Sequence, residues 1–218
     1  LLVCLYFASH SRIAAASGES KWITGGRARE RVHAERAWVD AVLVGSGTAL
    51  ADDPSLTARP GGVEAVRQPI RIVVDAHGRL PAAAKLLHAP GHAIIATTAA
   101  ADAAWKRAIT ATGATIIECE PAETGVNLHQ LLRTLARRGI MSIWAEGGGS
   151  LTGSLFEGGH VDEVWAFIAP IILGSDSIPA VSGFTARHMA EALRLRDVVI
   201  EPLHPDMLIR GYTGAWSP

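Results

Sequence analysis

Short apolar runs that alternate with helix-like segments constrain the fold of this chain more than any other feature. Ala41–Val44 and Ala93–Ala96 contain no polar side chain, and glycine or polar residues follow both runs. Strands that are apolar on both faces are typical of parallel sheets with helices packed on each side. Between the runs lie segments such as Leu128–Arg138, in which leucine recurs at the spacing of an amphipathic helix. The alternation therefore predicts an α/β fold with a mostly parallel central sheet flanked by helices.

The end of the chain follows a different pattern. The strand-like segments Asp197–Glu201 and Met207–Tyr212 are joined by the turn-forming residues His204-Pro205-Asp206. This arrangement predicts a C-terminal antiparallel hairpin. No internal repeat or long linker divides the sequence, so we expect a single domain over residues 1–218. In total, we expect strands at 1–8, 41–44, 70–75, 93–96, 115–119, 142–145 and 163–169, and helices at 27–39, 100–112, 128–138 and 151–157.

Composition excludes several classes of function. The chain has 218 residues, 49% of them hydrophobic, and its 20 basic side chains nearly balance 21 acidic ones. This balance argues against nucleic acid or an anionic membrane as the main partner. Cys4 and Cys119 lie in or beside apolar runs, which favours reduced thiols over a disulfide. The histidines show no metal-ligand spacing, and the first apolar run is too short to span a bilayer, so we expect a cytoplasmic protein without a metal site.

The stretch Glu146-Gly147-Gly148-Gly149-Ser150 lies between an expected strand and an expected helix. Such a turn points backbone N–H groups and a helix N-terminus at an anion, usually a phosphate. A tight turn without a ligand is the alternative that the local pattern leaves open. Gly45–Asp53 and Thr97-Thr98 also follow expected strands, and the carboxyl ends of parallel strands are where ligands bind. Together these segments predict a nucleotide site.

Several side chains near these turns could carry chemistry. Asp52 and Asp53 are adjacent, and neighbours in an extended segment point in opposite directions, so we assign Asp52 to the pocket and Asp53 to capping a turn. Glu146 could bind a substrate amide edge, or it could complement the charge of a helix N-terminus. Arg36 and Arg59 could hold a phosphate through bidentate bonds, although a solvated surface position is the alternative for each.

No side chain in the sequence has the context of an activated nucleophile. The sequence contains no GxSxG motif, and no histidine has an identifiable partner. Trp22 could stack on a planar ring, or it could be an ordinary core residue. This pattern favours a cofactor that supplies the reactive group.

Several motifs stand in order over nearly the whole chain: Ser17–Thr24 (SGESKWIT), Val44–Thr48 (VGSGT), Ala51–Leu56 (ADDPSL), Pro69–Asp75 (PIRIVVD), Glu146–Leu151 (EGGGSL) and Val161–Gly174. Together they resemble one family, the reductase domain of the bifunctional riboflavin-biosynthesis deaminase/reductase. The resemblance implies a dihydrofolate-reductase-like fold, usually a homodimer, without the deaminase domain that usually precedes it. It also implies NADPH-dependent reduction of 5-amino-6-(5-phosphoribosylamino)uracil, with hydride delivered to the carbon of a C=N bond in the opened sugar.

Matching motif by motif, the resemblance implies roles for individual residues. Asp52 and Glu146 would be the catalytic carboxylates, with Glu146 reading the pyrimidine. The sugar phosphate end would be held by Ser20, Arg36, Leu56 and Arg59. The cofactor would be bound by Tyr6, Trp22, Thr48, Asp52, Gly148, Gly149, Ser150, Leu151, Thr152, Gly153 and Ser154.

The sequence also departs from the family pattern. Cys4 stands where the family usually has a lysine, and Ser9-His10-Ser11 replaces a Leu-Asp-Gly turn. Ala76 stands where the family has a serine in the turn after the third strand, and the resemblance implies that this serine contacts the cofactor. Three interpretations therefore stay open: the riboflavin-pathway reductase, a same-fold reductase of dihydrofolate or another pterin, and a non-catalytic nucleotide-binding module. The sequence does not identify the partner of the cofactor's 2′-phosphate.

Overall fold

The computed structural model describes residues 2–8, 12–14, 23–123, 125–173 and 176–214. The chain divides into two compact units. The first unit contains His33–Trp144, and the second contains Leu2–Val32 and Ala145–Pro218. Whether the chain acts as a single domain stays a prediction.

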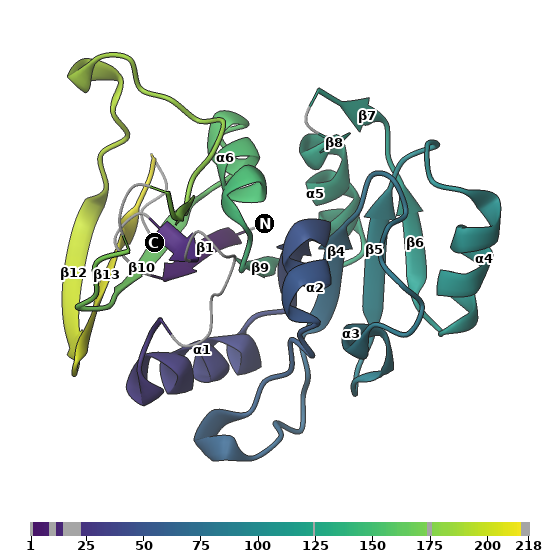
Figure 1. Cartoon of the computed structure of the whole chain (residues 1–218), viewed down its shortest axis with the longest axis horizontal. Coiled ribbons are helices and arrows are strands. Elements are labelled where there is room, and N and C mark those ends of the chain that lie inside the picture. Colours follow the sequence, from purple (N-terminus) through teal and green to yellow (C-terminus); the bar gives the residue numbers. More distant parts are fainter. Residues whose placement is uncertain (1, 9–11, 15–22, 124, 174–175, 215–218) are drawn as a thin grey trace. The chain divides into compact units, whose positions relative to one another are not determined.

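The first unit is built around strands in the order β9-β3-β4-β5-β6, of which Figure 1 labels β9, β4, β5 and β6. The pairs β3–β4, β4–β5 and β5–β6 are parallel, with Leu43 opposite Ile72 and Ile72 opposite Ile94. The apolar composition explains the burial, since every residue of β5 and all of β3 but its last residue are buried. The strands are β3 (Ala41–Gly45), β4 (Ile70–Val74), β5 (Ala93–Thr97), β6 (Thr115–Glu118) and β9 (Ser142–Ala145).

The helices of the first unit begin at side-chain caps where the sequence supplies them. Asp102 accepts hydrogen bonds from the backbone N–H groups of Ala104 and Trp105 at 2.7 and 3.1 Å and starts α4 (Ala103–Ala111). Asn127 caps α5 (Leu128–Arg137) in the same way, and the leucines of α5 are buried. The remaining elements are α2 (Ser46–Asp52), α3 (Lys85–His88), the 3₁₀ turn η1 (Pro60–Gly62), and the short strands β7 (Pro121–Ala122) and β8 (Gly125–Val126).

Arg71 is the polar side chain inside β4, and it is 1% exposed. Its guanidinium donates to the carbonyl groups of Ala89, Pro90 and Gly91, just after α3. The buried cation would be costly without these carbonyl partners. Arg71 therefore ties the loop after α3 to the centre of the sheet.

The second unit combines parallel and antiparallel strand pairs. β1 (Leu2–Ala8) pairs in parallel with β10 (Glu163–Ile168). β13 (Asp206–Tyr212) lies antiparallel to β10 and to β12 (Arg196–Leu203), which confirms the predicted C-terminal hairpin (Figure 1). Its other elements are β2 (Arg12–Ala14), β11 (Ile178–Pro179), α6 (Gly149–Glu157) and the 3₁₀ turn η2 (Met189–Glu191), while α1 (Gly26–Trp38) runs from this unit into the first.

The predicted fold class is confirmed, and two local expectations are corrected. Gly45–Asp53 was expected to be a polar loop, but residues 46–52 form the helix α2. Helix-forming residues at 49–51 outweigh Gly47, and the helix stops at Asp53, which adopts a left-handed φ of 39° ahead of Pro54. Helix α6 starts two residues earlier than expected, so Gly149 and Ser150 belong to the helix and not to the turn.

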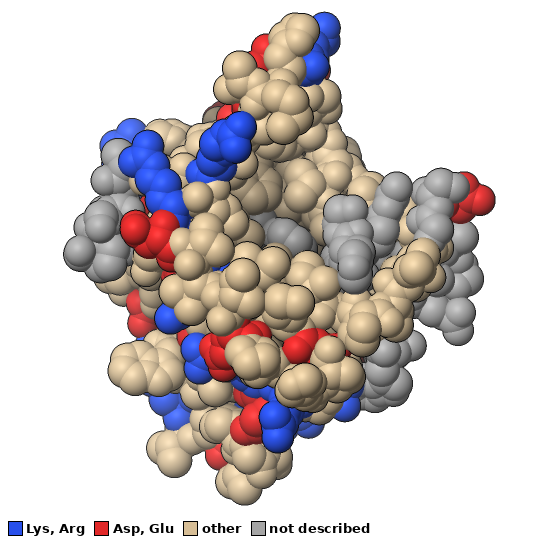
Figure 2. Space-filling model, turned by 90° about the vertical axis from the view of Figure 1, so that its left-hand side faces the viewer, with Lys and Arg blue, Asp and Glu red and all other residues tan. Residues whose placement is uncertain are grey.

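Over the described residues, no helix is long and apolar enough to cross a membrane. The same part of the chain contains no group of three or more His, Cys, Asp or Glu side chains that could hold a metal ion. Cys4 and Cys119 are free thiols, as expected. Figure 2 shows blue and red side chains interspersed on the visible face, with no block of one sign, in keeping with the balanced charge of the sequence.

Candidate functional site

The carboxyl ends of β3, β4 and β5 lie at one edge of the first unit's sheet because the strands are parallel. Helix α2 follows β3 at this edge. Asp75 follows β4, and Thr98 follows β5. Open parallel sheets bind ligands at this edge, which makes its polar side chains candidates for a site.

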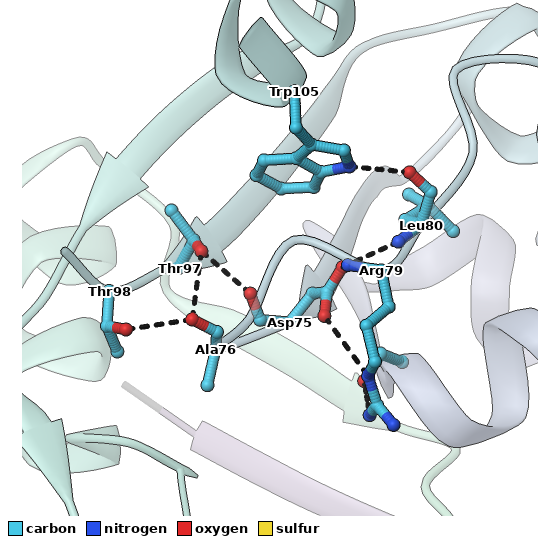
Figure 3. A network of polar contacts seen from close by, with 8 residues as sticks. Asp75, Ala76, Arg79, Leu80, Thr97, Thr98 and Trp105 are labelled. Carbon is cyan, nitrogen blue, oxygen red and sulfur yellow. Dashed lines mark hydrogen bonds and ion pairs between the residues drawn. The ribbon is translucent and has the colours of Figure 1, made fainter. Parts of the chain in front are cut away.

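Asp75 organises the turn after β4 (Figure 3). Its side chain is 0% exposed, and Oδ2 accepts hydrogen bonds from the backbone N–H groups of Arg79 and Leu80 at 2.7 and 2.8 Å. The hydroxyl of Thr97 donates to the Asp75 carbonyl at 2.7 Å, and the hydroxyl of Thr98 donates to the Ala76 carbonyl at 2.8 Å. The turn is thus fixed by a carboxylate from one strand and hydroxyls from the next.

Gly78 allows this turn to fold tightly against α4. It has a φ of +69°, and a Cβ atom there would lie 2.8 Å from the ring of Trp105. The Trp105 ring N–H donates to the Leu80 carbonyl at 2.7 Å. Any larger residue would therefore have to displace the ring and break this bond.

Arg79 extends from this turn toward the start of α2 (Figure 3). Its Nη2 donates to the Ser46 hydroxyl at 2.7 Å, and its Nε lies 3.9 Å from Oδ1 of Asp75. The Arg79 side chain is nevertheless 57% exposed. Sequence reasoning missed this residue, because its position depends on the turn folding back and not on any local motif.

The adjacent carboxylates at the end of α2 have different surroundings. Asp53 accepts the backbone N–H of Lys85 at 2.9 Å, and its Oδ2 lies 3.3 Å from the Lys85 ammonium. Asp53 therefore anchors the start of α3, whereas the sequence predicted that it would cap the turn that follows it. Thr48 and Asp52 are half-buried on α2. Their roles toward a cofactor stay predictions.

The structure brings three of the predicted phosphate residues to one loop in the first unit. Leu56 is 3% exposed and adopts a φ of 52°, which turns the chain sharply before Thr57. Arg36 donates from α1 to the Thr57 carbonyl at 3.1 Å, and Arg59 is exposed two residues further on. Arg36 and Arg59 thus both belong to the surroundings of this constrained backbone, and arginines can hold an anion through bidentate bonds.

His33 also holds this loop, and sequence reasoning missed it. Its Nδ1 accepts the backbone N–H of Arg59 at 3.3 Å and lies 3.2 Å from the Thr57 carbonyl. His33 precedes Arg36 by about one helical turn, and this spacing was the available signal.

In the second unit, the predicted glycine turn leads from β9 into α6. Glu146 is half-buried at its start, and Gly148 is the N-cap of α6, where no side chain caps the helix. At Gly149, a Cβ atom would lie 2.5 Å from the Pro179 carbonyl oxygen, and at Gly153 it would overlap the carbonyl of Ser182. Both glycines therefore lie against the chain's own segment 179–184, and their role toward a cofactor stays a prediction.

Within α6, Thr152 is 0% exposed, and its hydroxyl has no hydrogen-bond partner among the described residues. A buried hydroxyl of this kind is unfavourable unless a further group binds it. Ser150, in the first turn of the same helix, is exposed. The uncapped helix start and the Thr152 hydroxyl are therefore suited to an oxygen-rich, anionic group.

The remaining predicted residues are only partly described. Ser20 and Trp22 lie outside the described residues, and for Tyr6 the backbone in β1 is described but not the side chain. Cys4 is 6% exposed in β1, and its thiol donates to Oε2 of Glu163 at 3.5 Å. Cys4 thus takes the place of the expected lysine without supplying an ammonium group.

Comparison with known proteins identifies the relatives of this chain. A family model described as the RibD C-terminal domain matches residues 11–209. The riboflavin biosynthesis protein RibD of Escherichia coli (strain K12) is 34% identical over 209 residues, which cover 91% of this chain and 55% of that protein. The riboflavin biosynthesis protein PYRR, chloroplastic, of Arabidopsis thaliana is 34% identical over 203 residues, which cover 92% of this chain and 33% of that protein. The chain therefore spans about half the length, or less, of these relatives.

Solved structures with a similar fold lead to the same family. Acinetobacter baumannii RibD, form 1, superposes with a TM-score of 0.85 at 31% identity, covering 98% of this chain and 58% of that one. Dihydrofolate reductase from Enterococcus faecalis superposes with a TM-score of 0.51 at 9% identity, covering 98% of this chain and 97% of that one. The second likeness shows the fold alone, and it confirms the predicted dihydrofolate-reductase-like architecture.

Proposed function

The chain belongs to the RibD C-terminal domain family, and from this we propose that it is an NADPH-dependent reductase of riboflavin biosynthesis. Its substrate would be 5-amino-6-(5-phosphoribosylamino)uracil, which it would reduce to the ribitylamino form. A relative from Thermotoga maritima, 26% identical with a TM-score of 0.76, carries this uracil reductase in its description. The observation in this chain that carries the proposal is the loop at Leu56–Arg59, which is suited to a sugar phosphate.

The phosphate end of the substrate would bind at this loop. Arg36 is already fixed by its bond to the Thr57 carbonyl, so less conformational entropy is lost when it meets an anion. Arg59 is exposed and can add a second pair of N–H donors. By family resemblance, Ser20 and Leu56 would complete this end of the site.

The ring end of the substrate and the reacting bond would use carboxylates. Glu146 can accept hydrogen bonds from the N–H groups of a pyrimidine. Reduction of a C=N bond adds a hydride to carbon and a proton to nitrogen. An acidic group at the reaction centre could supply that proton. We assign Asp52 to that place, because Asp53 already binds Lys85.

The residues present fit a phosphorylated dinucleotide. The uncapped start of α6 and the Thr152 hydroxyl, which has no partner among the described residues, would hold the diphosphate with Gly148–Ser154. Tyr6, Trp22 and Thr48 would line the rest of the cofactor. Bound NADPH would supply the hydride, while the protein would align the partners, which is worth roughly 7–11 kcal/mol of barrier.

We also propose that residues 1–218 act as one reductase domain, as a cytoplasmic homodimer. Val198, Val199 and Ile200 on β12 are 49%, 45% and 61% exposed. β12 lies at the end of the strand order, and an exposed apolar edge strand favours pairing with another chain. Replacing Val199 with Lys should shift the mass measured by light scattering from dimer to monomer. A wild-type monomer would contradict the proposal.

The activity test measures NADPH oxidation separately with the phosphoribosylamino-uracil and with dihydrofolate. We expect turnover with the uracil alone, and turnover with dihydrofolate alone would overturn the proposal. Arg36→Ala and Arg59→Ala should each raise KM about tenfold or more, since each removes charge-assisted bonds to the phosphate. Arg133→Ala is the matched control, because Arg133 is an exposed arginine on α5 of the same unit. An unchanged KM would remove Arg36 or Arg59 from the phosphate site.

A further inference from the structure

His33 contacts two backbone groups of the loop 57–59 through one ring nitrogen. Its Nδ1 lies 3.3 Å from the backbone nitrogen of Arg59 and 3.2 Å from the carbonyl oxygen of Thr57. In a neutral ring with its proton on Nε2, Nδ1 can accept the Arg59 N–H. In an imidazolium ion both ring nitrogens carry a proton, so Nδ1 can only donate to the Thr57 carbonyl. The protonation state of His33 therefore decides which of the two bonds forms.

Other side chains hold the loop in either state of His33. The amide of Gln68 accepts the backbone N–H of Ala58 at 2.8 Å and donates to the Ala58 carbonyl at 3.0 Å. Arg36 donates to the Thr57 carbonyl at 3.1 Å, and this oxygen has a second lone pair that can accept from His33. Thr57 and Ala58 are 4% and 0% exposed, so packing also fixes them. An exchange of the partner of His33 thus leaves the loop in place.

Protonation of His33 changes the loop in two ways that favour an anion. It releases the Arg59 N–H, and the bond that holds this N–H is exposed, so a ligand can reach the released donor. It also adds a positive charge close to Arg36, because the Arg36 guanidinium and Nδ1 of His33 contact the same Thr57 carbonyl oxygen. Like charges at this distance oppose each other unless an anion binds to both. Protonation and anion binding therefore favour one another.

The charged groups around His33 in the described part of the chain come from its own helix and from the loop. On α1, Arg29, Glu30 and Arg36 lie within about one turn of His33 in the sequence, and the Glu30 side chain is exposed. Within the loop, Arg59 is the charged residue. Cations outnumber the carboxylate in this set, so the set disfavours the imidazolium form of His33 until an anion binds.

We propose that His33 is a positioning residue of the phosphate site, and that it takes up a proton from solvent when a phosphate dianion binds to the loop 57–59. This inference rests on the proposed function for the sugar phosphate that the loop would bind. The proton completes the imidazolium ion, Nδ1 then donates to the Thr57 carbonyl, and the Arg59 N–H becomes available to a phosphate oxygen. An imidazole with an ordinary pKa of about 6.5 can make this change near neutral pH.

Sulfate is the probe that tests this linkage. It resembles a phosphate dianion but stays doubly charged between about pH 6 and pH 8.5, so any dependence of its affinity on pH comes from the protein. Isothermal titration calorimetry on the full chain should give an affinity about five- to tenfold higher at about pH 6 than at pH 8.5, because a bound dianion raises the pKa of a neighbouring imidazole by about one unit. Titrations near pH 7 in buffers of different ionisation enthalpy should show proton uptake on binding.

Two histidine variants separate the charge of His33 from its structural contacts. His33→Gln keeps an acceptor for the Arg59 N–H but cannot take up a proton, so its sulfate affinity should stay constant within about twofold over this pH range. Compared with wild type at the same pH, His33→Gln should raise KM for the uracil about fivefold at about pH 6, leave KM unchanged at about pH 8.5, and leave kcat unchanged at both. His129→Gln, which removes an exposed histidine on α5 of the same unit, should keep the wild-type pH dependence.

The outcomes also separate this inference from the proposed function. A wild-type chain that does not bind sulfate at about pH 6, or binds it equally well at pH 8.5, overturns the role of His33, as does a His33→Gln variant with the wild-type pH dependence. If sulfate binding depends on His33 and pH but the chain reduces no uracil, the reductase proposal fails while the role of His33 stands. If the chain reduces the uracil but its sulfate affinity does not change with pH, the role of His33 fails while the reductase proposal stands.

Discussion

Two turns that follow strands, one in each unit, differ in the contacts that their residues make with the rest of the chain. In the turn Asp75–Leu80, Oδ2 of the carboxylate accepts two backbone N–H groups, while Oδ1 is buried without a hydrogen bond among the described residues and the Arg79 side chain remains exposed. In Glu146–Ser154, Gly149 and Gly153 pack against the chain's own segment 179–184, and the buried Thr152 hydroxyl has no hydrogen-bond partner among the described residues. Glycine-rich sequence thus reports a close approach of backbone, but not whether a ligand or the protein makes it.

The largest effect should come from Asp52 at the edge of the first unit. Asp52→Asn should lower kcat about 100-fold, or about 2.7 kcal/mol, if this carboxyl group acts at the reaction centre. Asp53→Asn should leave kcat within about threefold, because Asp53 binds Lys85. The loss of this contact should instead lower the free energy of unfolding by about 1 kcal/mol. Steady-state kinetics with the uracil substrate measures both. Equal losses of kcat would mean that the wrong carboxylate carries the chemistry.

The glycines of α6 give the next largest effect, on stability. A Cβ atom at Gly153 would overlap the Ser182 carbonyl, which is backbone and cannot move aside easily. The steric penalty of about 3 kcal/mol outweighs the gain in helix propensity of about 1 kcal/mol, so Gly153→Ala should lose about 2 kcal/mol. Urea unfolding measures the loss, with the exposed Ser150→Ala as control. A stable Gly153→Ala variant would break the comparison, because it would show that the contact with Ser182 does not require glycine at this position.

How far the sequence predicted this structure differs between the elements. Apolar runs such as Ala41–Val44 determined their strands because burial on both faces leaves no other arrangement for them. Helix α2 was missed because Gly47 and the adjacent aspartates suggest a turn, while packing in the folded chain favours the helix.

The candidate site divides in the same way. Arg36, Leu56 and Arg59 could be grouped from the sequence because they belong to recognisable motifs, although their role stays a prediction. Arg79 and His33 could not, because each gains its position from hydrogen bonds to residues that the fold brings near. Local patterns identify where a chain can bend, but they do not identify which distant groups meet there.

A smaller effect is expected at Thr152, whose variant tests whether a buried polar group serves the fold or a ligand. Thr152→Val keeps the shape of the side chain and removes a buried hydroxyl without a described partner, so stability should stay the same or rise by about 1 kcal/mol. If the hydroxyl binds the cofactor, calorimetry should show NADPH affinity falling about tenfold in the same variant. A loss of stability with unchanged affinity would show that the hydroxyl serves the fold, as the polar groups around Asp75 do.

Asp40, at the opposite edge of the first unit's sheet from Asp75, should give the smallest effect. It accepts the backbone N–H groups of Met141 and Ser142 at 2.9 and 3.0 Å and pairs with Arg67 at 2.5 Å. Burial raises the pKa of Asp40, but these hydrogen bonds and the Ser142 hydroxyl together outweigh it, so its pKa lies below the ordinary 3.8. Asp40→Asn should lower the free energy of unfolding by about 1 kcal/mol at neutral pH.

The sign of this effect with pH follows from the lowered pKa. A carboxyl group with a depressed folded pKa stabilises the protein fully above its unfolded value and loses that contribution as the pH falls below it. The difference between wild type and Asp40→Asn should therefore be constant from neutral pH down to about pH 5 and shrink below the ordinary value of 3.8. Urea unfolding across this range measures it. If the difference in the free energy of unfolding between wild type and Asp40→Asn persists in acid, the lost stability comes from packing and not from the charge of Asp40.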